Sequence, residues 1–337
     1  MLKKSIFVLV ASSFITFLVL SLPGCGGGNG GASNPATNFN PQPYPSPVPA
    51  SNPVAASAVG ASYYVDPVAG SDAASGTQAA PFKTLTWAIK AASVVAAASG
   101  VNINAASGVY SAASGETFPL KPTFGEYLIG TGIADVEGSG NYTITGGQRA
   151  VAISTTFAFA PGVSASLTGF TASGVAATVV VADGANITLS GNSLRFATNG
   201  TNIPVWVVNG STATITSNTI TGGVTIDSAD AATKVIARGN TLYGTVYTAH
   251  YTATASQLDL GTAASPGNNI IKNVSSGVAG VTSLGAASDV GVTAVGNTWL
   301  SNVQGADASG HYAASNVAGP TSAGPNYYIV PASGIQF

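Results

Sequence analysis

Four charged side chains between residues 227 and 238 have the spacing best suited to catalysis. Asp227 and Asp230 share one loop, and Lys234 and Arg238 follow closely. A polysaccharide lyase abstracts a proton next to a carboxylate with a Lys or Arg base, usually beside Ca²⁺ held by about six to eight oxygen ligands. A compact carboxylate group for such an ion is not evident, and no spacing singles out the carboxylate pair of a glycosidase. A solvated loop with scattered charges is the alternative interpretation.

Aromatic side chains offer a second kind of site. A sugar-stacking platform could be built from Trp206, Tyr243, Tyr247 and Tyr251, because aromatic faces stack on sugar rings. Packing in the core is the competing interpretation of Trp206.

Three carboxylates near the start of the domain have two possible roles. Asp66, Asp72 and Glu116 stand in loops where a carboxylate can bond backbone amides, and this organising role is the main prediction. An ion site built from some of them is the sharper alternative. No cofactor is predicted, and calcium or another ion is the alternative ligand of these carboxylates.

A repeat shows which elements must position these side chains. Asn recurs, usually after Gly or Ser, between a β-prone run and an apolar residue, at Asn192, Asn218, Asn240, Asn269 and Asn297. The steps of 26, 22, 29 and 28 residues indicate a stacked solenoid. Stacked Asn side chains could form a hydrogen-bonded amide ladder. An earlier coil is predicted 22 residues before Asn192, with Phe170 in the Asn position.

The runs before each Asn identify the repeat. Residues 186–190, 212–216, 233–237 and 291–295 are short, alternating and rich in Val, Ile and Thr, which is typical of strands. Leucine-rich and helical repeats require apolar spacings that are missing. The sequence therefore predicts an all-β parallel β-helix.

One amphipathic helix is predicted before the repeats, from Thr84 to about Ala98. Leu85, Ala88, Ile89 and Ala92 fall on one face, with Thr84 as N-cap. Trp87, in the same helix, is expected to pack. Because an open first coil exposes strand edges, this helix is predicted to cap the solenoid.

These elements carry a family resemblance. Its motifs are Tyr63-Tyr64-Val65-Asp66, Gly70-Ser71-Asp72, Pro81-Phe82-Lys83-Thr84-Leu85, Gly108-Val109-Tyr110, Gly115-Glu116-Thr117-Phe118-Pro119-Leu120, Leu258-Asp259-Leu260-Gly261-Thr262 and Pro266-Gly267-Asn268-Asn269. They resemble bacterial lipoproteins of a domain-of-unknown-function family. The resemblance implies a right-handed, single-stranded, pectate-lyase-like parallel β-helix with an N-terminal capping helix. Val101-Asn102-Ile103-Asn104 departs from the family pattern, since an acidic residue common in that bend is missing.

The N-terminal region predicts export and lipidation. Residues 1–24 read as a lipoprotein signal peptide that ends in Leu22-Pro23-Gly24-Cys25, with Cys25 as the lipidated residue. A Gly- and Pro-rich tether follows at 25–60, then a cap module with the first coils at 61–145 and the remaining coils at 146–337. The expected location is the outer membrane or cell surface, and the membrane is the first expected partner.

Composition narrows the function further. Charged residues are 7% of the chain, and without Lys3 and Lys4 it holds 8 basic against 12 acidic residues. No basic cluster or phosphate-cradling loop stands out, so neither nucleic acid nor nucleotide is an expected partner. The sequence favours a surface protein that binds a polysaccharide or partner protein through a β-helix face. A carbohydrate-active lyase or hydrolase is the alternative.

Overall fold

A computed structural model describes residues 61–95, 100–123, 125–144, 151–159, 161–196, 203–227, 232–243, 246–250, 258–262, 264–272, 281–285, 292–293, 296–299, 317–318 and 335–336. The chain divides into two compact units, residues 1–44 and 45–337, and every described residue belongs to the second. The predicted signal peptide, Cys25 and tether lie outside the described residues. Among the described residues, no helix has the length and apolar character to span a membrane.

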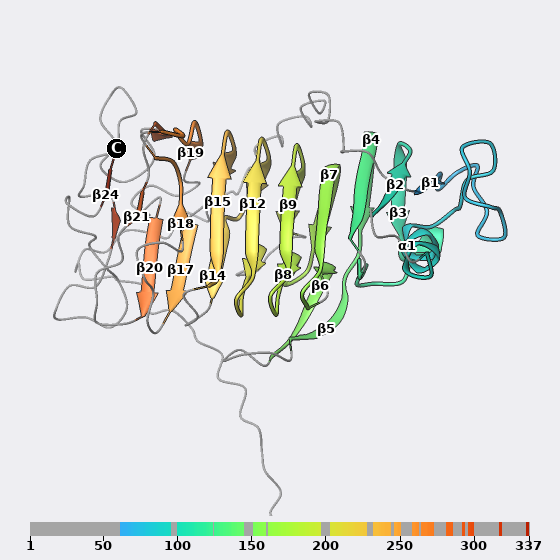
Figure 1. Ribbon diagram of the computed structural model, residues 1–337, viewed down its shortest axis with the longest axis horizontal. Coiled ribbons are helices and arrows are strands. Elements are labelled where there is room, and N and C mark those ends of the chain that lie inside the picture. The colour runs from blue at the N-terminus through green and yellow to red at the C-terminus, as the bar shows by residue number, and fades with distance from the viewer. Residues whose placement is uncertain are drawn as a thin grey trace, which may run out of the picture. The chain divides into compact units, whose positions relative to one another are not determined.

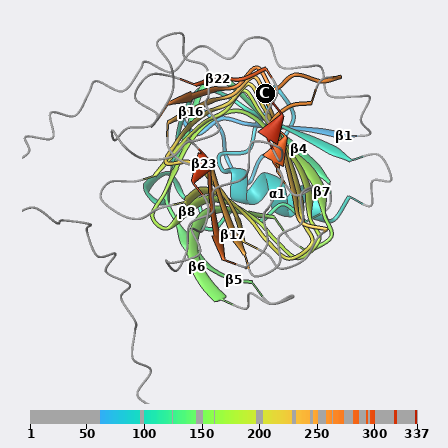
Figure 2. The same ribbon diagram turned by 90° about the vertical axis from the view of Figure 1, so that its left-hand side faces the viewer.

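Two sheets of stacked strands form a parallel β-helix, which confirms the predicted fold class (Figure 1). The larger sheet comprises β1 (Ala61–Val65), β2 (Val101–Ala105), β3 (Gly108–Ser111), β4 (Glu126–Glu137), β7 (Ser164–Gly174), β9 (Asn186–Ser190), β10 (Ser193–Phe196), β12 (Thr212–Thr216), β13 (Thr219–Thr221), β15 (Lys234–Arg238), β16 (Thr241–Tyr243), β18 (Leu258–Asp259), β19 (Ile270–Lys272), β21 (Val292–Thr293), β22 (Thr298–Trp299) and β24 (Ile335–Gln336). The second sheet comprises β5 (Gly140–Ile144), β6 (Val151–Phe159), β8 (Ala177–Val181), β11 (Ile203–Val207), β14 (Val224–Asp227), β17 (Val246–His250), β20 (Val281–Gly285) and β23 (Val317–Ala318). Figure 2 looks along the stack, where equivalent strands of successive coils superpose.

Alternation of apolar and polar residues determines which side of each strand faces the core. Leu167, Leu189 and Ile215 occupy one register position on β7, β9 and β12, and all three are fully buried. Burying one such side chain contributes about 1.5–3 kcal/mol. The predicted strands at 186–190 and 212–216 coincide with β9 and β12, and the one predicted at 233–237 is displaced by one residue from β15.

The amide ladder is present, as the repeat predicts, and its Asn residues from Asn192 to Asn269 are buried. The Oδ1 atom of each Asn from Asn218 to Asn297 accepts from the backbone N and the Nδ2 of the preceding Asn, at 2.8–3.1 Å. At the first rung Phe170 occupies the Asn position, and its backbone N donates to Asn192 Oδ1 at 3.0 Å. The earlier coil around Phe170 is therefore confirmed.

The left-handed backbone of each bend lies one residue before the ladder Asn, where the preference for Gly is strongest. Gly191, Ser217, Gly239, Asn268 and Gly296 have φ between 51° and 76°. None of the five ladder Asn residues has a positive φ. The preceding residue turns the chain, and the Asn side chain is left to bond between coils.

Helix α1 (Leu85–Ser93) packs against the first coil, and a 3₁₀ turn follows β3 at Ala112–Ser114. The predicted face of Leu85, Ala88, Ile89 and Ala92 is buried, and the Thr84 side chain accepts from Trp87 N at 3.1 Å. These observations confirm the capping helix and its N-cap. The helix ends earlier than predicted, because Val94 and Val95 bond three residues back and tighten its last turn.

Two features depart from the expected pattern. Trp87 is 39% exposed, so the expectation that it packs is wrong, and Lys90 Nζ lies 4.7 Å from its ring centroid. The second feature is an antiparallel pair, β5 with β6, at the edge of the second sheet. A small apolar cluster with Tyr142, Ile144 and Val180 covers the outward face near this edge.

Candidate functional site

The outward face of β7, β9 and β12 is a regular array of uncharged polar side chains. We call it the Ser/Thr face, and its nine residues are Ser164, Ser166, Thr168, Asn186, Thr188, Ser190, Thr212, Thr214 and Thr216. Each residue of one strand pairs in register with its counterpart on the next. Neighbours therefore repeat at about 4.8 Å across the strands and about 6.7 Å along them.

The polar groups of the Ser/Thr face are open to solvent. Every one of the nine residues is exposed or partly exposed. Within the described part of the chain, none of their side chains makes a hydrogen bond. A Ser or Thr hydroxyl both donates and accepts, and an Asn amide does the same. The face therefore presents a repeating set of donors and acceptors to a ligand.

Different side chains border the two edges of this face. On β4, Tyr127 and Ile129 pair in register with Ser166 and Thr168, and both are partly exposed. On the other side β15 continues the rows, with Lys234 next to Thr212. The hydroxyl array thus lies between an aromatic and apolar strand and a strand that carries charge.

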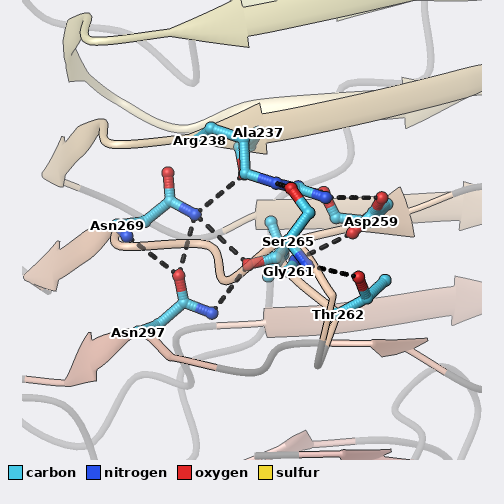
Figure 3. Close-up of polar contacts among 9 residues, drawn as sticks. Ala237, Arg238, Asp259, Gly261, Thr262, Ser265, Asn269 and Asn297 are labelled. Atoms are coloured by element: carbon cyan, nitrogen blue, oxygen red, sulfur yellow. Dashed lines mark hydrogen bonds and ion pairs between the residues drawn. The ribbon is translucent and has the colours of Figure 1, made fainter.

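Arg238 is engaged in holding a loop (Figure 3). Its Nη2 lies 2.8 Å from Asp259 Oδ2, Nη1 donates to the Asp259 carbonyl, and Nε donates to Ser265 Oγ at 3.1 Å. Asp259 Oδ1 also accepts from Gly261 N at 2.8 Å. This guanidinium, considered as a base from the sequence, ties Asp259 and Ser265 to β15.

The other three catalytic candidates are only partly placed. Lys234 is exposed at the start of β15. Asp227 ends β14 in the other sheet, and its side chain lies outside the described residues, as does all of Asp230. The described residues therefore bring no carboxylate of this loop together with Lys234.

The four aromatic candidates do not share one described surface. Trp206 is only 8% exposed and packs in the outer apolar cluster of the second sheet. Tyr243 lies on β16 of the larger sheet. The backbone at Tyr247 aligns with Trp206 through Thr225, but the Tyr247 side chain and all of Tyr251 lie outside the described residues.

Asp66 and Asp72 organise loops through backbone amides, as the sequence predicts. Asp66 Oδ1 accepts from Val68 N and Ala69 N, both at 2.8 Å. Asp72 Oδ1 accepts from Lys83 N and Thr84 N at 3.0 and 2.9 Å, just before α1.

Glu116 caps the N-terminus of α1 from a distant segment. Its side chain is buried and accepts from Leu85 N at 2.7 Å and from Thr86 N at 2.9 Å. Burial raises the pKa of Glu116 above its ordinary value, the hydrogen bonds from Thr86 and Leu85 lower it, and the Asp72 carboxylate raises it. Across the described residues, no three or more His, Cys, Asp or Glu side chains gather as a metal site.

One pair of charged side chains, Arg195 with Asp135, is not predicted by the sequence. Arg195 Nη2 on β10 lies 3.5 Å from Asp135 Oδ2 on β4. Burial raises the pKa of the Asp135 carboxyl, Arg195 lowers it, and Glu137 raises it. Asp135 and Arg195 are 60 residues apart, so only the register through β7 could have revealed their proximity.

The fold and the Ser/Thr face define an all-β solenoid protein with a capped first coil. The chain belongs to the family described as "Protein of unknown function (DUF1565)", whose profile matches residues 68–318. The predicted membership of a domain-of-unknown-function β-helix family is thus confirmed. No curated protein and no solved structure matches the chain.

Proposed function

We propose that this protein binds a neutral polysaccharide through the Ser/Thr face. The in-register array of nine solvent-accessible, uncharged hydrogen-bonding side chains supports the proposal. A polysaccharide is a repeating polymer of hydroxyl groups, so a surface with repeating donors and acceptors can engage several of its units. Tyr127, at the edge of the face, offers an aromatic ring on which a sugar can stack.

Binding is tested with variants that remove hydroxyl groups and preserve strand shape. In Thr188→Val with Thr214→Val, two neighbouring hydroxyls of the face become methyl groups. The matched control is Thr219→Val with Thr241→Val, a register pair on β13 and β16 outside the face. Each hydrogen bond contributes about 0.5–1.5 kcal/mol, so losing two costs about 1–3 kcal/mol and should weaken binding about five- to 150-fold.

The assay is depletion of the full-length protein by insoluble cellulose, mannan and starch, followed by quantification of the unbound fraction. We expect wild type and control to bind at least one of these polymers, and the face variant to bind it at least about fivefold more weakly. Equal weakening in both double variants, or no binding by wild type, would overturn the proposal. Analysis of the supernatant for unsaturated or shortened sugars tests the enzymatic alternative, and their release would contradict a role in binding alone.

We also propose that the protein is lipid-anchored at the outer membrane or cell surface. The proposal rests on the sequence Leu22-Pro23-Gly24-Cys25 after an apolar stretch with two preceding lysines. In a bacterial host, Cys25→Ser should shift the protein from the membrane to the soluble fraction and abolish incorporation of a labelled fatty acid. Ser46→Ala, in the predicted tether, should change neither, and labelling that survives Cys25→Ser would contradict the anchor.

A further inference from the structure

The outward surface of the larger sheet continues beyond the Ser/Thr face onto β4, β2 and β1 (Figure 1). We call this part the amide–aromatic extension, and its residues are Tyr64, Asn102, Asn104, Tyr127 and Ile129. Tyr127 pairs in register with Asn102 on one side and with Ser166 of the Ser/Thr face on the other. All five residues are partly exposed and none is charged, so the extension suits an uncharged ligand, as the face does.

The ring of Tyr127 is held against the neighbouring strand. A side chain at Gly100, just before β2, would clash with the Cε2 atom of Tyr127, so the ring rests directly on the Gly100 backbone. The Tyr127 hydroxyl makes no hydrogen bond with the described residues. An aromatic ring that leans over the sheet in this way can offer its free face to the apolar side of a sugar ring.

Asn102 lacks a hydrogen-bond donor for its side-chain oxygen. Its Oδ1 is buried and has no partner in the described part of the chain, although the residue as a whole is partly exposed. Asn104, the next outward residue of β2, differs because its Nδ2 donates to the Tyr63 carbonyl at 3.2 Å. A buried acceptor without a donor costs free energy. Because χ2 of Asn is a soft torsion, rotation of the Asn102 amide can bring its Oδ1 to a donor on a ligand.

An acetamido sugar has the groups that these side chains require. Its N–H and C=O match the acceptor and donors of the Asn102 amide, and its methyl group suits contact with Ile129. Asn102 lies about 4.8 Å from Tyr127 across the strands, and Ile129 lies about 6.7 Å from Tyr127 along β4, as the strand geometry requires. A plain hexose has neither the N–H nor the methyl group.

We propose that the amide–aromatic extension binds an N-acetylhexosamine unit, and that the neutral polysaccharide on the Ser/Thr face carries such units. The sugar ring stacks on Tyr127, the acetamido group bonds to Asn102, and the acetyl methyl contacts Ile129. This inference rests on the proposed function of the Ser/Thr face, because one polysaccharide chain crosses both surfaces.

Isothermal titration of the full-length protein with two oligosaccharides of equal length and linkage tests the site. One is built of N-acetylglucosamine and the other of glucose, so they differ only in the acetamido group. We expect wild type to bind the first about two- to twelvefold more tightly, which is the contribution of one hydrogen bond. Asn102→Leu should remove this preference. The matched control, Asn186→Leu, removes an exposed amide from the Ser/Thr face and should leave the ratio of the two affinities unchanged.

Saturation-transfer NMR on wild type tests the same contact without a variant. Irradiation of the protein should saturate the acetyl methyl protons of the bound oligosaccharide more strongly than its ring protons. The reverse order would overturn the contact with Ile129 and the proposal with it.

The outcomes of the titration separate this inference from the proposed function. Equal affinity of wild type for the two oligosaccharides would overturn the inference and leave the binding of a neutral polysaccharide standing. A preference that survives in Asn102→Leu, or that is lost equally in Asn186→Leu, would overturn the inference as well. Absence of binding to either oligosaccharide would overturn both proposals.

Discussion

An inner rung of the amide ladder should stabilise the protein more than its first rung. Asn218→Ala removes the Oδ1 that accepts from the backbone N and the Nδ2 of Asn192, both at 2.9 Å. Asn192→Ala removes the Oδ1 that accepts only from Phe170 N, at 3.0 Å. Both side chains are buried. Each buried donor left without an acceptor costs about 1–3 kcal/mol. We therefore expect a loss of about 2–6 kcal/mol for Asn218→Ala and about 1–3 kcal/mol for Asn192→Ala.

Equilibrium urea unfolding of the full-length protein, followed by circular dichroism, measures both losses. Thr214→Ala is the control, since the Thr214 side chain is on the outward face and makes no hydrogen bond with the described residues. This variant should change the unfolding free energy by less than about 0.5 kcal/mol. The slope against urea should be unchanged in all three variants. Equal losses of unfolding free energy in the two Asn variants would refute the idea that each unpaired donor adds its own cost. A loss for Asn218→Ala as small as that of Thr214→Ala would refute a stabilising role of the ladder.

Three further predictions concern the cap, the core and one loop. The pKa of Glu116 is raised in the folded state, so the unfolding free energy should fall as pH rises from near 4.5 through the folded pKa. Urea titrations at several pH values measure this slope, and Glu116→Gln should flatten it. An unchanged slope in the variant would contradict this prediction. Gly267→Ala should lower the unfolding free energy by about 3 kcal/mol, because the new Cβ would lie 1.8 Å from the Leu260 carbonyl oxygen. Gly191→Ala is the comparison, since a Cβ there meets open space. A loss for Gly267→Ala no larger than that for Gly191→Ala would contradict the clash. Arg238→Gln should lower the unfolding free energy by about 0.5–1 kcal/mol, since its ion pair is partly exposed. It should also speed proteolysis at residues 259–265, whereas Lys234→Gln should not. Equal proteolysis rates in the two variants would contradict the role of Arg238 in holding this loop.

The sequence predicts the features that repeat along the chain. Asn192 and its successors stand at the same point of each coil, so their stacking follows from the period, and even the substitution by Phe170 is recognisable. The face of α1 and its Thr84 cap follow from local spacing in the same way. These features depend on residues near each other in sequence or separated by one repeat.

Contacts that cross several strands on the outward face are harder to predict. Asp135 and Arg195 meet because register through β7 brings their strands together, and no local pattern marks either residue. Trp206 packs in the outer cluster because Val180 aligns with it from the neighbouring coil. Trp87 shows the converse, since this large apolar side chain falls on the exposed side of an amphipathic helix. Alternation along a strand predicts which residues face outward. Which side chains lie beside them on the adjacent strands depends on the register between strands.

The one-way polarity of the Asn ladder has a consequence for how this protein can change in length. Every rung presents the same acceptor to the coil before it and the same donors to the coil after it, although coil length varies from 22 to 29 residues. A duplicated coil with Asn at this position would therefore fit between two existing coils without a new interface. Phe170 has no side-chain amide, so it ends the series on β7, and the coils of β4 and β2 stand between it and the capping helix. Duplication of a coil can thus lengthen the stack, and deletion of one can shorten it, while the capped end stays unchanged.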